Sequence, residues 1–187
     1  MTLGTLASFA LNRKLALNRV LDPLLMLPLG TSAVTLGLGF LVVFNRPPVD
    51  VRSFALLLPI AHSLVATPFV VRILQPALAS IPDNLRQAAA ILGAPPWRVW
   101  LEVDLPVIGR AMLVGSIFAF TISLGEFGAT SFLARPDMPT LPVAIFRFLS
   151  LPGALNYGQA LAMATILMLI CGICIFVMEA IGDASPG

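Results

Sequence analysis

Charged residues are scarce in this sequence. Asp, Glu, Lys and Arg make up 11% of its 187 residues, whereas a soluble domain carries about a quarter. This scarcity excludes an ordinary water-soluble globule. Because 58% of the residues are hydrophobic, the 16 prolines and 14 glycines do not indicate disorder either. The mean hydropathy of +0.97 instead places the chain in a lipid bilayer.

Several functional classes lack the residues that they need. The net charge of +2 comes without a cluster of Lys and Arg, so we expect no nucleic-acid partner. Cys171 and Cys174 share one apolar run, have no further Cys or His nearby, and therefore predict neither a disulfide framework nor a metal site. The one histidine, His62, and the scattered carboxylates form no catalytic cluster. We expect no catalytic residue, no cofactor and no enzyme.

Four windows are long and apolar enough to cross a membrane as helices, which takes about 20 residues. They are Leu24–Phe44, Ser53–Val71, Ala111–Ala134 and Ala154–Met178. A shorter apolar piece, Met1–Asn12, is interpreted as the inner end of another helix, so the chain is expected to be part of a longer membrane protein. The predicted fold class is all-α: a polytopic transmembrane helix bundle with four full spans and a partial N-terminal one.

Basic residues are unequally distributed between the loops that alternate across the membrane. Seven lie in segments 12–22 and 72–110, and four lie in the loops of the other side. The positive-inside rule therefore places segments 12–22 and 72–110 in the cytoplasm, and the tail from Glu179 with them.

The cytoplasmic segment 75–110 is too long and too regular for a simple connector. Ser80, Pro82 and Asp83 are typical of a helix N-terminus, with Ser80 as a capping side chain. One apolar face follows at helical spacing and consists of Leu85, Ala88, Ala89 and Leu92. These positions predict a first helix that ends near residue 92.

A sharp turn and a second helix complete this segment. Gly93 stands where a left-handed residue would end the first helix, and Pro95 and Pro96 prevent its continuation. The second helix is expected from Trp97 towards Asp104, with Arg98 and Glu102 spaced for an i,i+4 pair. The alanine-rich face of the first helix either docks on a soluble partner or packs against its own bundle; the residues alone favour neither.

The same segment carries a motif. Gln87-Ala88-Ala89, three residues, Gly93, nine residues, Val103, one residue and Leu105-Pro106 resemble the EAA loop of ABC import permeases. That loop reads Glu-Ala-Ala, three residues, Gly, nine residues, Ile, one residue, Leu-Pro. The spacing matches throughout, with Gln87 in place of Glu and Val103 in place of Ile. A Gln side chain at this position can hydrogen-bond but cannot form an ion pair.

The resemblance extends over nearly the whole chain. Segments 84–89, 97–100, 123–130, 131–137 and 139–145, together with 27–30 and 32–37, are similar to the C-terminal half of the thiamine ABC transporter permease. Permeases for sulfate, molybdate and ferric iron share the EAA loop and forms of the Gly125-Glu126-Phe127-Gly128 segment. These permeases remain alternatives to thiamine or its phosphates as the solute class.

The resemblance implies a MetI-like ABC permease fold in the inner (cytoplasmic) membrane, with residues 1–187 as one transmembrane permease domain. Its partners would be an ATP-binding cassette ATPase dimer, an extracytoplasmic solute-binding protein, a second permease half or subunit, and membrane lipid. This sequence contains no Gly-x-x-x-x-Gly-Lys-Ser/Thr phosphate loop, so the resemblance assigns ATP hydrolysis to the ATPase. The residues implied in coupling to the ATPase are Gln87, Ala88, Ala89, Gly93, Leu105 and Pro106.

Glu126 is the only carboxylate deep in a predicted span. A carboxylate in the membrane is a candidate for the solute pathway, because lipid exposure of a charge costs at least about 2.5 kcal/mol. The alternative is a structural carboxylate that is hydrogen-bonded to backbone or to a helix end. A rival for the whole chain is a secondary transporter that needs no ATPase; such a protein would show paired charges near the midplane and no cytoplasmic helical loop.

Overall fold

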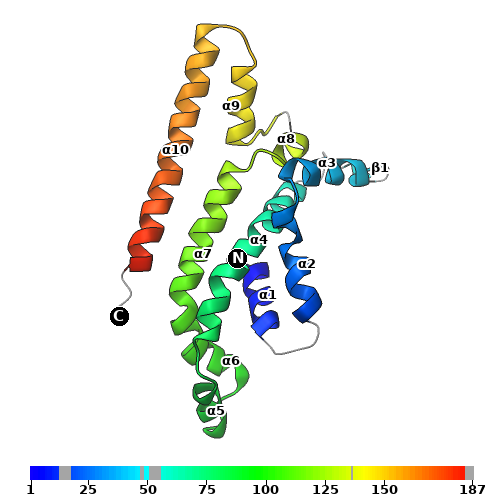
Figure 1. Cartoon of the computed structure of the whole chain (residues 1–187). Helices are drawn as coiled ribbons and strands as arrows, with labels where there is room; N and C mark the ends of the chain where they lie inside the picture. Colours follow the sequence, from blue (N-terminus) through cyan, green and yellow to red (C-terminus); the bar gives the residue numbers. More distant parts are fainter. Residues whose placement is uncertain (13–17, 47–48, 51–55, 136, 184–187) are drawn as a thin grey trace.

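The computed structural model describes residues 1–12, 18–46, 49–50, 56–135 and 137–183, and most of them are helical (Figure 1). In chain order the elements are α1 (Thr2–Asn12), α2 (Asn18–Gly30), α3 (Ala33–Phe44), β1 (Asn45–Arg46), β2 (Val49–Asp50), α4 (Leu57–Ala79), α5 (Asp83–Ile91), α6 (Pro96–Val99), the π-helical turn η1 (Trp100–Asp104), α7 (Leu105–Gly125), α8 (Thr130–Leu133), α9 (Leu141–Leu149) and α10 (Ala154–Asp183). The strands β1 and β2 form one short antiparallel pair, Asn45 with Asp50 and Arg46 with Val49. The predicted all-α, multi-pass bundle is confirmed.

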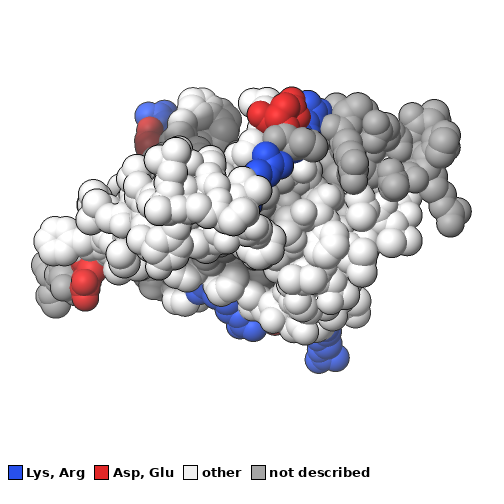
Figure 2. Space-filling model, turned by 90° about the horizontal axis from the view of Figure 1, so that it is seen from above, with Lys and Arg blue, Asp and Glu red and all other residues white. Residues whose placement is uncertain are grey.

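Within the described residues, three helical segments are long and apolar enough to cross a membrane: Leu57–Ala79, Pro96–Gly125 and Ala154–Gly182. The predicted last span corresponds to α10. The predicted span Ser53–Val71 corresponds to α4, which begins at Leu57 and continues to Ala79; residues 53–55 lie outside the described residues. Seen from the α9 end, the surface is mostly uncharged, and the charged side chains lie at its edges (Figure 2).

The predicted span Leu24–Phe44 is not one straight helix. It is broken at Thr31 and Ser32 into α2 and α3, whose axes differ by 101°. The bend lays α3 across the bundle beside α8 (Figure 1). Gly37 of α3 sits directly on the backbone of Ala129, where an added Cβ would lie 2.6 Å from the Ala129 Cα. Hydropathy cannot reveal this bend, because the tertiary contact that holds it lies far along the chain.

The predicted span Ala111–Ala134 is also wrong at its C-terminal end. The helix α7 ends at Gly125, Glu126 is extended, and a separate short helix, α8, follows. On its N-terminal side α7 is longer than predicted, because α6, η1 and α7 are continuous. The second helix of segment 75–110 is therefore the first part of this long helix.

The small apolar core lies around α4 at two ends of the bundle. One cluster joins Leu78, Ile81 and Ile108 near the loop formed by α5 and α6. The other joins Leu57, Ala61 and Leu133 beneath α8. In contrast, α10 packs mainly on α7 and α9 and leaves most of its apolar length exposed (Figure 1). The bundle thus has an outer apolar surface suited to lipid, as the family resemblance implies.

The loop of α5 and α6 lies at one end of the bundle, and α3, α8 and α9 lie at the other (Figure 1). Asn12, at the end of α1, lines a cavity of about 440 Å³ together with Arg86 and Trp100 of that loop. Asn12 and the helical loop, which the charge count placed on one side of the membrane, therefore meet at one end of the molecule.

We expect a cysteine introduced at the exposed Asn84 to react with a membrane-impermeant maleimide only from the cytoplasmic side. A cysteine at Met138, which is 70% exposed, should react only from the opposite side. The two positions lie at opposite ends of the bundle, and the basic loops favour the cytoplasm. Labelling would be compared in inside-out and right-side-out vesicles, with Cys171 and Cys174 replaced by alanine. Reversed labelling would overturn the topology.

Candidate functional site

The first candidate site is the helical elbow of α5 and α6. Gln87 and Ala88 are exposed, and Ala89 is half-buried. Next to them the elbow leaves large apolar side chains uncovered, since Ile91 and Leu92 are 86% and 87% exposed and Trp97 is 65% exposed. The exposure of Ala88, Ile91 and Leu92 argues against packing of this face on its own bundle. It favours a surface that another protein covers.

The turn of the elbow has the predicted left-handed glycine. Gly93 has a φ of +77° and no atom near its missing Cβ. The N–H of Ala94 donates to the carbonyl of Ala89 at 3.0 Å, and that of Gly93 donates to Ala90 at 3.0 Å. These two bonds form a Schellman motif, in which a left-handed residue closes a helix C-terminus. The local sequence therefore determines this turn.

The start of α5 differs from the prediction. Pro82 occupies the N-cap position, and no side chain caps the helix there. Ser80 does not cap it, because Ser80 ends α4 and its hydroxyl donates to the carbonyl of Ala77 at 2.8 Å. Only three residues separate α4 from α5, and Ser80 forms the C-terminal end of α4 instead of the N-terminus of α5.

Two ion pairs stabilise the elbow. The predicted pair Arg98–Glu102 is confirmed, with 2.7 Å between Nε and Oε1, and it is exposed. Sequence reasoning missed a second pair, in which Arg86 Nε donates to Asp104 Oδ1 at 2.8 Å. Asp104 is buried, so this pair fixes α5 against η1 more firmly than an exposed pair could. The two residues are 18 positions apart and lie on different helices, so no i,i+3 or i,i+4 spacing predicts this pair.

Leu105 and Pro106 begin α7, where the chain returns to the bundle. Pro106 has no N–H to donate to the carbonyl of Glu102, four residues earlier. The preceding turn is π-helical, and the N–H of Leu105 donates to Trp100, five residues earlier. The proline is thus accommodated by a wider turn and does not break the helix.

We expect Arg86→Gln to lower the free energy of unfolding by about 1.5–3 kcal/mol, because the buried Asp104 would lose its charged partner. Unfolding of the detergent-solubilised protein by SDS would measure the change. Arg98→Gln is the matched control and should have little effect, since its pair is exposed. Equal effects of the two variants would contradict the role assigned to Arg86–Asp104.

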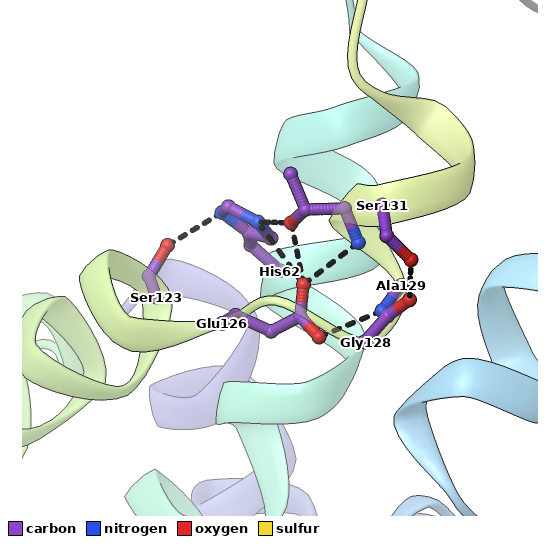
Figure 3. Close-up of polar contacts among 7 residues, drawn as sticks. His62, Ser123, Glu126, Gly128, Ala129 and Ser131 are labelled. Carbon is purple, nitrogen blue, oxygen red and sulfur yellow. Dashed lines mark hydrogen bonds and ion pairs between the residues drawn. The ribbon is translucent and has the colours of Figure 1, made fainter. Parts of the chain in front are cut away.

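The second candidate site surrounds Glu126, at the other end of α7 (Figure 3). Its carboxylate is buried and accepts two backbone hydrogen bonds, from Ala129 N to Oε1 at 2.7 Å and from Thr130 N to Oε2 at 2.9 Å. The Thr130 hydroxyl also donates to Oε2. Glu126 therefore satisfies the first N–H groups of α8, which matches the structural alternative given for it above.

The polar network continues to α4 and back to α7 through His62 (Figure 3). The ring lies 2.9 Å from Thr130 Oγ1 through Nε2 and 2.7 Å from Ser123 Oγ through Nδ1. The Thr130 hydroxyl donates its one hydrogen to Glu126, so it accepts from His62 Nε2–H. Nδ1 of a neutral ring then accepts from Ser123. These hydrogen bonds connect α4, the end of α7 and α8.

His62 is thus a histidine with both ring nitrogens hydrogen-bonded. Sequence reasoning did not connect it to Glu126, Ser123 or Thr130. The one sequence pattern that relates these residues is the position of Ser123 three residues before Glu126, which places both near the end of one helix. The partnership with residue 62 depends on the tertiary packing of α4 against α7.

We expect Glu126→Gln to lower the free energy of unfolding by about 1–3 kcal/mol, because the amide NH₂ would face a backbone N–H in place of an acceptor. Ser131→Ala is a control in the same turn; its exposed hydroxyl donates only to Gly128, at 2.8 Å. SDS unfolding would compare both with the unmodified protein. A Glu126→Gln variant as stable as Ser131→Ala would contradict the capping role.

Among the residues that the structure describes, no group of three or more His, Cys, Asp and Glu side chains could hold a metal ion. Cys171 and Cys174 are half-buried free thiols on α10.

The bundle of apolar helices, with the exposed elbow at one end, defines a polytopic membrane protein. The chain belongs to the family of binding-protein-dependent transport system inner membrane components, which matches residues 1–184. The expected membership of the ABC permeases is thereby confirmed, and with it an inner-membrane location.

The chain is similar to several curated permease proteins. A Salmonella typhimurium permease protein named for 2-aminoethylphosphonate transport is 32% identical over 144 residues, which are 77% of this chain and 53% of that protein. The molybdenum transport system permease protein ModB of Haemophilus influenzae is 37% identical over 112 residues, or 58% of this chain and 49% of that protein. An Anthoceros angustus permease protein named for sulfate transport is 32% identical over 134 residues, or 71% and 43%. The chain spans about half the length of the curated relatives that it matches.

Proposed function

We propose that this chain is a transmembrane permease domain of an ABC importer, coupled to a separate ATPase through the elbow. The observation that carries the proposal is the exposed face of Gln87, Ala88 and the apolar residues beside them, on a chain of this family. In the proposed complex Gln87, Ala88 and Ala89 contact the ATPase. Gly93 shapes the turn.

The continuous helix α6–η1–α7 would transmit the movement. Leu105 and Pro106 lie within it, so a displacement of the elbow moves the N-terminal end of α7 with no flexible linker in between. The Arg86–Asp104 pair holds α5 to the same helix. Closure of the ATPase on ATP would therefore tilt α7 and drive alternating access in a two-state bundle.

The proposed complex has further members. Residues 1–187 would form one domain of a longer permease with two halves, and the second half or subunit would complete the pathway. An extracytoplasmic solute-binding protein would deliver the solute at the end of α8 and α9. Lipid would cover the exposed length of α10.

We propose thiamine or its phosphates as the solute, on the sequence resemblance given above. The relatives that we report are named for transport of 2-aminoethylphosphonate, sulfate and molybdenum. Their names support an oxyanion, such as sulfate or molybdate, as the second candidate; ferric iron is a further one. We place Glu126 at the border of the proposed pathway, where its carboxylate also accepts hydrogen bonds from Ala129 and Thr130.

We expect Gly93→Val to reduce ATP-driven uptake strongly, because a β-branched residue in the left-handed region costs at least about 1–2 kcal/mol. Gly93→Asn should retain most uptake, since asparagine tolerates this conformation and no atom lies near the missing Cβ. The measurement is uptake of radiolabelled thiamine, sulfate and molybdate by cells with the complete transporter. Assembly with the ATPase would be checked by co-purification.

If the valine variant assembles and transports as well as the asparagine variant, the coupling role of the turn is wrong. If uptake of these solutes by the unmodified complex continues after ATP depletion, the proposed coupling to an ATPase is wrong and the complex acts as a secondary transporter.

A further inference from the structure

One exposed face of α5 carries no charged residue. Four exposed residues recur on it at i, i+3, i+4 and i+7, and this spacing places them in one stripe along the helix. They are Asn84, Gln87, Ala88 and Ile91. The elbow also exposes the apolar side chains of Leu92 and Trp97. It therefore presents an uncharged surface that is apolar towards the turn.

Lipid cannot cover this surface, because the elbow lies outside the apolar part of the bundle. The helical stretch Pro96–Gly125 has 30 residues; it is about 45 Å long, whereas the hydrocarbon core of a bilayer is about 30 Å thick. Its charged residues all lie in the half next to the elbow. They are Arg98, Glu102, Asp104 and Arg110. The elbow end of this helix is thus the one that leaves the membrane, and a protein partner would cover its apolar side chains.

The cations of the elbow are paired within the elbow itself. Residues 80–106, all of which the structure describes, contain two cations: Arg86 binds Asp104, and Arg98 binds Glu102. The remaining charged residue, Asp83, lies in the first turn of α5, where the N–H groups of the helix N-terminus favour a carboxylate. No cation of the elbow therefore lies on the stripe to neutralise a carboxylate there.

We propose that the ATPase covers the stripe with an apolar groove that has a neutral hydrogen-bonding group, and no basic residue, opposite Gln87. The proposal rests on the function proposed above and adds the chemistry of the partner's surface. Charge complementarity supports it, because a charged group brought against an uncharged face loses its water without gaining an opposite charge. The Gln87 amide can both donate and accept hydrogen bonds, and it costs less to desolvate than a carboxylate.

Gln87 would then also select the ATPase. A groove with a cation at this place suits a permease that has Glu in the EAA loop. Docked on Gln87, the same cation would be buried without a partner. The permease would therefore reject an ATPase of that kind in favour of one with an uncharged groove.

The test measures binding of the transporter's own ATPase, purified separately, to inside-out vesicles that contain the complete permease and have been stripped of ATPase with urea. Gln87→Glu adds a carboxylate to the stripe, and Asp83→Asn removes the carboxylate one turn before it. Ile91→Asn removes an apolar side chain, and Ile91→Leu is its matched control. The three positions are exposed in this chain, so unfolding by SDS should not distinguish the variants.

We expect Gln87→Glu and Ile91→Asn each to weaken ATPase binding at least about ten-fold, because each places a charged or polar group in a groove with no partner for it. Ile91→Leu should bind at least about three-fold more tightly than Ile91→Asn, since it keeps the apolar surface. Asp83→Asn should change the dissociation constant by less than about three-fold, because no cation of the groove pairs with it.

Tighter binding by Gln87→Glu, or a ten-fold loss in Asp83→Asn, would reveal a basic residue in the groove and overturn this proposal, while leaving the coupling through the elbow intact. Unchanged binding by Gln87→Glu would overturn it too, and equal affinities of the two Ile91 variants would overturn the apolar groove. The proposed function itself fails, and this proposal with it, if the ATPase does not bind the unmodified permease.

Discussion

Backbone groups left unpaired at a helix end cannot be satisfied by lipid, so a break within the membrane needs hydrogen-bond partners from the protein itself. At the elbow, α5 ends in a Schellman motif that uses Gly93 to turn two N–H groups back to the helix. At the opposite end, the interruption between α7 and α8 is closed by Glu126, which accepts from Ala129 and Thr130. At η1 a π-helical turn absorbs Pro106. The two sites of the molecule are therefore places where a helix is interrupted and its backbone is satisfied by specific residues.

The helix α7 connects these two places. It has 21 residues, so its ends are about 30 Å apart at a rise of about 1.5 Å per residue. Asp104 precedes one end and pairs with the elbow, whereas Glu126 follows the other and holds α8. Along its length α7 packs on α4 and α10. A displacement at the elbow thus has a continuous helical route to the far end, which a flexible connection would not provide.

Local signals in the sequence predicted much of this architecture. The apolar windows identified α4 and α10, and the glycine and prolines around residue 93 predicted the elbow, because each is encoded within a few neighbouring residues. The bend between α2 and α3, the end of α7 at Gly125, and the pairs Arg86–Asp104 and His62–Thr130 were missed. Each of these depends on residues distant in sequence, and a hydropathy window contains only neighbouring residues. The function of Gln87 and its neighbours stays a prediction from resemblance, supported by their exposure.

The close contact between α3 and the turn before α8 has a consequence for the order of synthesis. Gly37 lies on the backbone of Ala129, and Gly128 in turn lies against Ala33 and Val34. The N-terminal partner of this contact leaves the ribosome long before Gly128 and Ala129 have been made. Until the later half is inserted, the segment 24–44 lacks the surface that fixes its bend, and its apolar length suits a single straight span. The mature arrangement of α2 and α3 therefore forms only after Ala129 has been inserted, because it depends on a non-local contact with its own cost in closure entropy.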